Sequence, residues 1–410
     1  MRGALLVVTL ALAARCGLPN PDWHPATGAV DAGSGPGALD AAADAPPPEP
    51  DADDGSSEPP DGGSEPDAAT APAIRTGITR CGVPDSCEFM DPRDPASWPF
   101  DPCSPWNRPI GDGAVYADVS SPALSTRAGG AQTTAAINCT EWSHPVFRED
   151  PAAGRATALS GSDEQGHAVS YWLMLPQVLT PAVGTDGHLH VIDAAERTVY
   201  EMFEARWSAD GSSVLATDLI KNDLYGAGVF DGAASPQGEI WHGVRAYGGS
   251  AIAGLIRKGE LQGGIRHALA IAVQRAAMNQ NTPNGRGYVW PASYRDDGWE
   301  RTYGSSGNVH MGTLLALTAS EPRPQIFSRE GITDPGVQAI AAALQDYGAY
   351  VVDATSDNLT FYAEPAELAA ERIDTAQLAR LLPYLRVISN SDAEHVGGGG
   401  HGRQCFAPPL

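Results

Sequence analysis

Carboxylates on a predicted strand are the first residues of this chain whose types and spacing could do chemistry. Glu201 and Glu204 lie in the run 198–207, TVYEMFEARW. Residues three apart on a strand point to opposite faces, so these two acids cannot form a catalytic pair with each other. A glycoside hydrolase needs one carboxyl group as acid and another as base or nucleophile. Glu201, which shares its predicted face with Phe203 and Trp207, suits the acid, because an apolar setting favours the protonated form.

Asp353 is the predicted partner of Glu201, because it ends a second predicted strand at 348–353. Asp193 ends the strand predicted at 188–193 and is an alternative. A structural interpretation stands beside the catalytic one. Strand carboxylates commonly form salt bridges, and acids at strand ends commonly cap turns.

A basic and aromatic set offers a different chemistry. Arg245, His267 and Tyr294 combine a cation with two groups that can exchange protons. Cleavage of a uronate polymer by β-elimination needs a cation to neutralise the carboxylate and a base to remove the neighbouring proton. The alternatives are structural: His267 lies on the apolar face of a strand predicted over 265–273, and Arg245 fits a buried, paired arginine.

Metal ligation has only a partial signal. His188 and His190 alternate with Leu189, so both face one way and form half of a metal site. The sequence shows no clear third ligand, and the HExxH motif of zinc proteases is absent. His395, His401 and Cys405 surround a glycine run and fit a loop at the chain end. We therefore predict no metal and no cofactor.

Other motifs and the net charge exclude several classes of protein. There is no P-loop, no dinucleotide-binding glycine fingerprint and no GxSxG nucleophile elbow. The formal net charge is -24, with 26 basic and 50 acidic residues. Nucleic-acid binding requires a basic surface, so we predict no nucleic-acid partner. Adsorption to anionic lipid is disfavoured for the same reason.

The N-terminus has the anatomy of a secretory signal, which we assign to residues 1–15. Arg2 precedes the apolar run 3–14, GALLVVTLALAA, which is too short to span a bilayer. We therefore expect export. Cys16 follows Ala-Ala-Arg and resembles the lipobox of bacterial lipoproteins, which predicts lipidation at Cys16 and the cell envelope as location. Arg15 departs from the small residue usual there, and ordinary cleavage that leaves a secreted protein is the alternative.

Residues 16–75 are predicted to be a disordered linker. The stretch 17–74 contains 12 acidic residues, no Lys or Arg, and almost no large apolar side chains. Such a composition cannot bury enough surface to offset the entropy of ordering. Half of the net negative charge lies there, so the charge of the chain says little about the ligand of its folded part.

Five cysteines follow the linker and, in an exported chain, predict disulfides. Cys81 and Cys87 are close enough in sequence to close a small loop, and Cys103 with Cys139 is the next predicted pair. The odd number leaves one cysteine without a partner within the domain.

Residues 76–410 are predicted to form one mainly β domain, a β-sandwich or jelly roll with a few helices. The runs 188–193 and 198–207 flank a short polar turn and predict a hairpin. A second strand pair is predicted at 348–353 and 358–364. Helices are predicted over 335–347 and over 374–382, where Asp374 can cap the first turn.

Several of these segments together resemble a family of secreted actinobacterial and myxobacterial proteins without an established activity. The resemblance rests on SPWNRPIG at 104–111, GVRAYGGSAIAGLIRKGEL at 243–261 and ALQDYGAYVVD at 343–353. In that family Ser-Pro-Trp-Asn opens the domain, and Gly-Val-Arg-Ala precedes a short helix that ends in Ala-Gly-Leu-Ile-Arg. It covers roughly 104–363 and implies export and a shared fold.

The function that we predict is that of an exported carbohydrate-active protein. Eight of the nine tryptophans lie in the domain, and sugars stack on exposed aromatic rings. We expect the partner to be an extracellular polysaccharide that is bound and hydrolysed by Glu201 with Asp353. The alternatives are a lyase that uses Arg245, His267 and Tyr294, and a surface glycan-binding module without catalysis.

Overall fold

Short strands rich in Val, Leu, Ile and Ala build most of this protein. The computed structural model describes residues 92–121, 124, 134–152, 154–176, 178–229, 243–356, 358–365, 367, 370–405, 407–408 and 410. It is 30% strand and 15% helix. The prediction of a mainly β domain with a few helices is therefore confirmed. The predicted signal peptide and linker lie outside the described residues, as do Cys16, Cys81 and Cys87.

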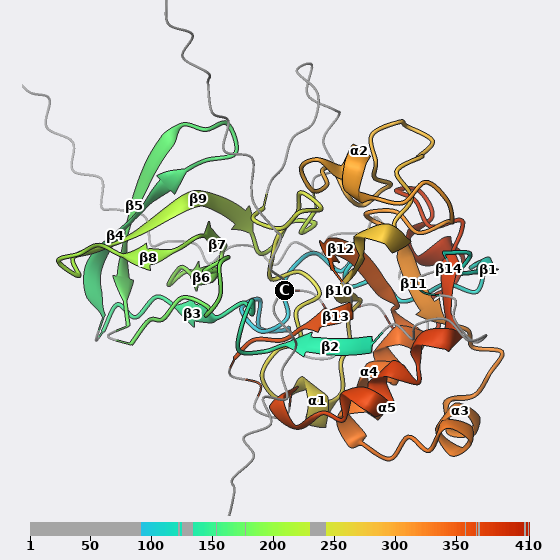
Figure 1. Cartoon of the computed structure of the whole chain (residues 1–410). Coiled ribbons are helices and arrows are strands. Elements are labelled where there is room, and N and C mark those ends of the chain that lie inside the picture. Colours follow the sequence, from blue (N-terminus) through green and yellow to red (C-terminus); the bar gives the residue numbers. More distant parts are fainter. Residues whose placement is uncertain are drawn as a thin grey trace, which may run out of the picture. The chain divides into compact units, whose positions relative to one another are not determined.

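One sheet is built mainly from the C-terminal half of the chain (Figure 1). Its strand order is β1-β14-β11-β12-β10-β13-β2. β10 lies between β12, with which it is parallel, and β13, with which it is antiparallel. The strands are β1 Tyr116–Asp118, β2 Thr134–Asn138, β10 Leu269–Gln274, β11 Leu314–Leu317, β12 Ala349–Thr355, β13 Asn358–Tyr362 and β14 Leu385–Ile388.

This order corrects two sequence predictions. Strands β12 and β13 both exist, but they are not neighbours, because β10 inserts between them. The strand predicted over 265–273 begins only at Leu269, so His267 precedes it. A local sequence pattern cannot distinguish a hairpin from two strands that are separated by a third. Here the third strand, β10, comes from 80 residues earlier in the chain, so the pairing is long-range.

The other sheet, drawn in green in Figure 1, has the order β3-β6-β7-β9-β4-β5, and β8 pairs with β9. The predicted hairpin is confirmed as β6 and β7, with Leu189 opposite Met202. Each sheet contains parallel pairs, here β3 with β6 and β4 with β9. The strands are β3 Val146–Arg148, β4 Arg155–Ser162, β5 Ala168–Leu175, β6 Leu189–Ile192, β7 Thr198–Phe203, β8 Arg206–Trp207 and β9 Ser213–Asp223.

Side-chain alternation divides this second sheet into two faces. Leu189, Val191 and Met202 belong to an apolar cluster on one face. The residues between them, among them His190 and Glu201, point to the other face. Glu204 has a φ of 51°, which ends the alternation after β7. Trp207 consequently packs against the first cluster, and the prediction that it shares a face with Glu201 is wrong.

The described helices are short, and acidic caps fix two of them. They are α1 Glu260–Gly263, α2 Trp299–Thr302, α3 Arg323–Glu330, α4 Pro335–Asp346 and α5 Thr375–Ala379. Both predicted helices are confirmed as α4 and α5, which lie near each other beside β2 and β11 (Figure 1). Asp334 and Asp374 cap them, and the Asp374 backbone N–H donates to Asp334 at 2.7 Å.

Replacing Asp334 with Ala should lower the free energy of unfolding by about 1 kcal/mol. The Asp334 carboxylate accepts from the N–H groups of Gly336 at 2.8 Å and Val337 at 3.2 Å, and alanine leaves both without that acceptor. Urea denaturation at pH 7 measures the change. Asp334→Asn is the control, because asparagine also caps helices, and equal losses in the two variants would contradict the capping role.

The Ser-Pro-Trp-Asn segment has a structural role in the core. Trp106 is fully buried, and the Asn107 amide donates to the carbonyl oxygens of Pro99 and Phe100 at 2.8 and 3.1 Å. Ser104 donates its hydroxyl to Ala227 O at 2.6 Å. These bonds join the start of the described chain to the core, so the segment does not form a catalytic motif.

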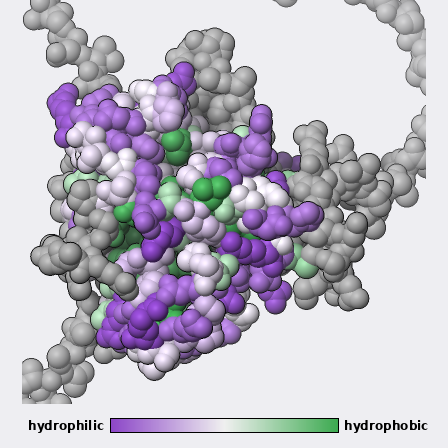
Figure 2. Space-filling view, turned by 90° about the vertical axis from the view of Figure 1, so that its right-hand side faces the viewer, coloured by the Kyte–Doolittle hydropathy of each residue, from purple (hydrophilic) through white to green (hydrophobic). Residues whose placement is uncertain are grey.

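Exposed apolar side chains are few among the described residues. The large ones are Val115, Trp172, Val178, Val183 and Tyr225. Figure 2 shows one face on which polar residues dominate and apolar residues form small separate patches. In the described part of the chain, no helix is both long and apolar enough to cross a membrane.

Candidate metal centre

Three histidines meet because of the register between β3 and β6. Val146 of β3 lies opposite His190 of β6 in a parallel pair, and the His190 N–H donates to Pro145 O at 3.0 Å. His144, two residues before Val146, therefore lies level with His188, two residues before His190. The chain folds these positions together although more than forty residues separate them.

The three imidazole rings form one compact, buried group. His144 and His190 are fully buried, and His188 is 3% exposed. Ring centroids lie 4.2 Å apart for His144 and His188, and 5.0 Å apart for His144 and His190. One nitrogen from each ring can be chosen so that all three lie within 4.8 Å of one another. Such convergence of nitrogen donors is the arrangement that a first-row transition metal requires.

Burial keeps these histidines neutral. Desolvation lowers the pKa of His144, His188 and His190 well below the usual value, and the nearby Arg245 guanidinium lowers each one further. A neutral imidazole has a free lone pair on one ring nitrogen, which is the form that binds a metal. At neutral pH the cluster therefore needs no deprotonation of imidazolium groups to bind an ion.

The hydrogen bonds within the cluster are incomplete. His144 Nδ1 lies 2.8 Å from His190 Nε2, so one proton is shared between these rings. The Nδ1 atoms of His188 and His190 are buried and have no hydrogen-bond partner among the described residues. A buried polar atom without a partner costs free energy, so two such atoms in one cluster are available to a ligand or a water.

Charged and aromatic groups surround the histidines. Arg245 forms an ion pair with Asp353 at 3.3 Å, and Tyr362 donates its hydroxyl to Asp353 at 3.2 Å. The Arg245 guanidinium lies 3.7 Å from the centre of the Tyr362 ring and within hydrogen-bond distance of His144 Nε2. Asp353 thus offsets the positive charge that Arg245 brings next to the histidines.

Asp186 completes this shell of charged groups. Its carboxylate lies 3.9 Å from His188 Nε2 and accepts from the Thr185 hydroxyl at 2.9 Å. Burial, and then repulsion from Asp353, raises the pKa of Asp186 to about 7. A nearby cation would favour the ionised form, so Asp186 can balance the charge of a bound metal.

Glu201 lies on the same face of the second sheet but has a different set of partners. It is fully buried and accepts from the Ser250 hydroxyl and from the Ala251 N–H, the latter at 3.0 Å. Burial raises its pKa to about 7. These bonds hold the segment after Arg245 against β7. Asp353 forms its ion pair with Arg245. The joint role of Glu201 and Asp353 in hydrolysis stays a prediction.

Glu201→Gln should change how stability depends on pH. The unfolded side chain ionises near 4.5 and the folded one near 7, so the stability that Glu201 contributes is fully present below pH 4.5 and is lost as the pH rises to 7. The loss is about 3 kcal/mol for a shift of this size. Glutamine cannot ionise, so the stability of the variant relative to wild type should rise by that amount between these pH values.

Urea denaturation at several pH values between 4 and 8 measures this difference. Glu300→Gln is the matched control, because Glu300 is exposed and its replacement should give a constant offset. A constant offset for Glu201→Gln as well would show that folding does not raise the pKa of Glu201.

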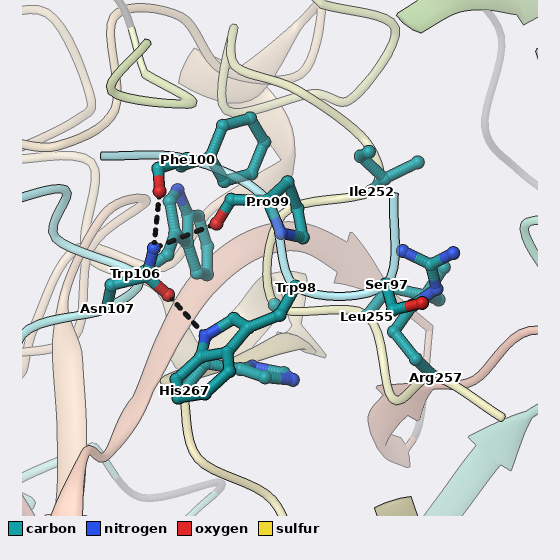
Figure 3. Close-up of a pocket in the computed structure, with 11 residues that line it drawn as sticks. Ser97, Trp98, Pro99, Phe100, Trp106, Asn107, Ile252, Leu255, Arg257 and His267 are labelled. Carbon is teal, nitrogen blue, oxygen red and sulfur yellow. Dashed lines mark hydrogen bonds between the residues drawn. The ribbon is translucent and has the colours of Figure 1, made fainter. Parts of the chain in front are cut away.

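His267 and Tyr294 lie elsewhere in the domain. His267 Nε2 is 3.1 Å from the Glu260 carboxylate, and His267 lines a cavity of about 10 Å³ with Trp98 and Asn107 (Figure 3). Burial alone would lower the pKa of His267, but Glu260 outweighs it and the pKa is raised. A cavity of this size holds one water at most. Tyr294 packs beside Arg295, whose guanidinium lies 5.1 Å from its ring.

The structure thus unites some of the predicted residues and adds others. Arg245 and Asp353, assigned from sequence to different mechanisms, form one ion pair. His188 and His190 turn toward the same cluster, as their alternation predicted, and His144, which no sequence pattern connected with them, is its third ring. The only sequence feature near His144 is the short apolar run that begins two residues later, and this run does not predict which strand pairs with it. Tyr362 was missed because it lies in an ordinary strand pattern.

Cysteine chemistry adds no ligand to this centre. Among the described cysteines, which are Cys103, Cys139 and Cys405, none is a free thiol. The predicted pairing of Cys103 with Cys139 stays a prediction, as does the Cys81–Cys87 loop.

Comparison with known proteins gives no relative: no family model, no curated protein and no solved structure matches this chain. The resemblance to secreted bacterial proteins with a Ser-Pro-Trp-Asn segment stays a prediction. The short helix that it implies before Arg257 is not found, because residues 251–254 form turns.

Proposed function

We propose that this chain is a metal-dependent hydrolase in which His144, His188 and His190 bind one divalent transition-metal ion. The observation that carries the proposal is the convergence of three buried, neutral imidazoles within 4.8 Å. Three histidines are a common ligand set for catalytic zinc, which keeps a fourth position open for water. Zn²⁺ is therefore the ion that we expect.

The neighbouring residues suit hydrolysis at such an ion. A divalent ion held by these histidines would supply an acidified water as the nucleophile near neutral pH. Arg245 and Tyr362 supply positive charge and a hydroxyl donor beside the ligands, where negative charge would develop on a substrate oxygen. Asp186, which lies 3.9 Å from His188 Nε2, is placed to accept a proton there in its ionised form.

The proposed substrate is an extracellular polysaccharide, and the proposed location is outside the cytoplasm. The signal at residues 1–15 and the tryptophan content of the domain support this part of the proposal. Lipidation of Cys16 would tether the domain to the cell envelope through the linker. Mass spectrometry of the mature N-terminus tests the lipid.

Two measurements test the proposal together. Elemental analysis of the purified chain should find about one Zn²⁺ per molecule, and dialysis against a chelator should remove it. The chain should then be incubated with a panel of polysaccharides, with and without restored Zn²⁺, while new reducing ends and released acyl groups are measured. Hydrolysis that needs Zn²⁺ supports the proposal, and a chain that neither binds metal nor hydrolyses any member contradicts it.

A second candidate, metal-free β-elimination, is favoured by one contact. Arg245 touches both His144 and Tyr362, which brings a cation, a base and a hydroxyl donor together. These are the groups that elimination of a uronate requires. The same panel distinguishes the two, because elimination creates an unsaturated uronate with its own ultraviolet absorbance and would persist after chelation.

A further inference from the structure

The second sheet carries the histidines on one face and a cavity on the opposite face. A cavity of about 530 Å³ opens there between the start of β4, the end of β5 and β8. This volume is within the range of sites that bind small ligands. Arg155, Thr157, Leu175 and Trp207 line it, together with two glycines that bring backbone but no side chain. Nothing in the proposed metal centre contributes to it.

Trp207 forms a fixed aromatic wall of this cavity. Its indole Nε1–H donates to Leu179 O at 3.0 Å, which sets the position of the ring edge. The side chain is partly buried against the apolar cluster of the sheet, so one part of the ring is packed and the rest lines the cavity. A flat, immobilised ring next to open volume presents the surface on which a sugar ring packs.

Arg155 supplies the charge of the site. Its guanidinium lies 5.9 Å from the centre of the Trp207 ring and donates to Gly211 O. Among the described residues, no carboxylate forms an ion pair with Arg155, although the chain carries a net charge of -24. Asp210, the nearest acid along the chain from Gly211, is occupied by hydroxyl groups of Ser208 and Ser212 at 2.7 and 2.8 Å.

We propose that this cavity binds a uronate residue of an acidic oligosaccharide, with the sugar ring against Trp207 and the carboxylate on Arg155. A guanidinium forms strong, charge-assisted hydrogen bonds with a carboxylate, and no carboxylate of the described residues forms an ion pair with this one. The Thr157 hydroxyl donates to Arg155 O at 3.0 Å, which fixes the backbone from which the arginine extends. The site would hold an acidic polymer independently of the metal centre.

Calorimetric titration of the full chain with trigalacturonate, and with neutral cellotriose for comparison, tests the site. We expect trigalacturonate to bind and cellotriose to bind at least about 10-fold more weakly, a difference of 1.4 kcal/mol. Trp207→Ala should weaken trigalacturonate binding at least about 10-fold. Arg155→Ala should remove the preference for the acidic sugar while leaving residual binding.

Trp172→Ala is the matched control. Trp172 is 71% exposed and lies on β5, where alternation turns it to the face opposite to Leu175, away from the cavity. Trp207→Leu guards against unfolding, because it keeps an apolar side chain in the cluster but lacks the flat ring. Equal affinity for both sugars, or an equal loss in Trp172→Ala and Trp207→Leu, would overturn the proposal. Binding should persist in chelator-treated protein, so failure of the metal centre and failure of this site are separate results.

Discussion

Replacing His190 with Ala should lower the bound Zn²⁺ from about one per chain to background and weaken the affinity at least about 100-fold. His190 contributes one of three convergent nitrogens, and its Nε2 lies 2.8 Å from His144 Nδ1, so its loss leaves two ligands and removes the hydrogen-bond partner of one of them. Titration against a competing chelator measures the affinity. Zn²⁺ at 100 times the dissociation constant should stabilise the wild type by about 2.7 kcal/mol and should not stabilise the variant.

His167→Ala is the control for this experiment. His167 is an exposed histidine in the turn between β4 and β5, and its side chain is 70% exposed. Its replacement should leave both zinc content and zinc-dependent stability unchanged. His190→Gln, which keeps polar atoms and most of the volume, separates loss of a ligand from loss of packing. Retention of zinc by both His190 variants would place the metal elsewhere.

Arg245→Ala should lower the free energy of unfolding by about 3 kcal/mol, because removing one partner of a buried ion pair leaves the other without compensation. The side chains of Arg245 and Asp353 are 3% and 15% exposed, so Asp353 would remain almost dehydrated and unpaired. The ring of Tyr362 would also lose the cation that lies 3.7 Å from its centre. Guanidinium chloride denaturation, run without metal, measures the loss.

A double-mutant cycle with Asp353→Asn identifies the source of that loss. Asparagine at position 353 removes the charge that Arg245→Ala leaves unpaired. The free energy of unfolding of the double variant should therefore be about 1 kcal/mol or more above that of Arg245→Ala. Arg329→Ala is the control, because Arg329 forms its ion pairs with a half-exposed side chain and such pairs contribute little. Strict additivity of Arg245→Ala and Asp353→Asn would show that the pair contributes no coupling.

Local patterns were sufficient to predict some of the elements of this fold. The alternation around His188 and Tyr200, with a polar turn between them, identifies the β6–β7 hairpin, and Asp334 and Asp374 mark the beginnings of α4 and α5. Each of these signals acts within about ten residues of sequence. The placement of β10 between β12 and β13 depends on pairing over long separations, which periodicity does not encode.

The same limit applies to the candidate site. His188 and His190 could be placed together from alternation, but His144 joins them only through the parallel register of β3 with β6. The sequence pattern predicted a buried position for Glu201, and the residue is fully buried. Its partners Ser250 and Ala251 come from a turn that no sequence motif predicts. The positive φ of Glu204 also reversed the face expected for Trp207.

The β3–β6 register also decides where the chain tolerates changes in length. The segment between His144 and His188 leaves the centre, forms the β4–β5 hairpin and returns, so insertions in the exposed turn at 163–167 leave the three rings where they are. One residue inserted between His144 and Val146 would instead displace the histidine by about 3.3 Å and turn it toward the other side of the strand. Tolerance to length variation is therefore asymmetric, because the exposed turn of the hairpin accepts added residues and the link between His144 and β3 does not.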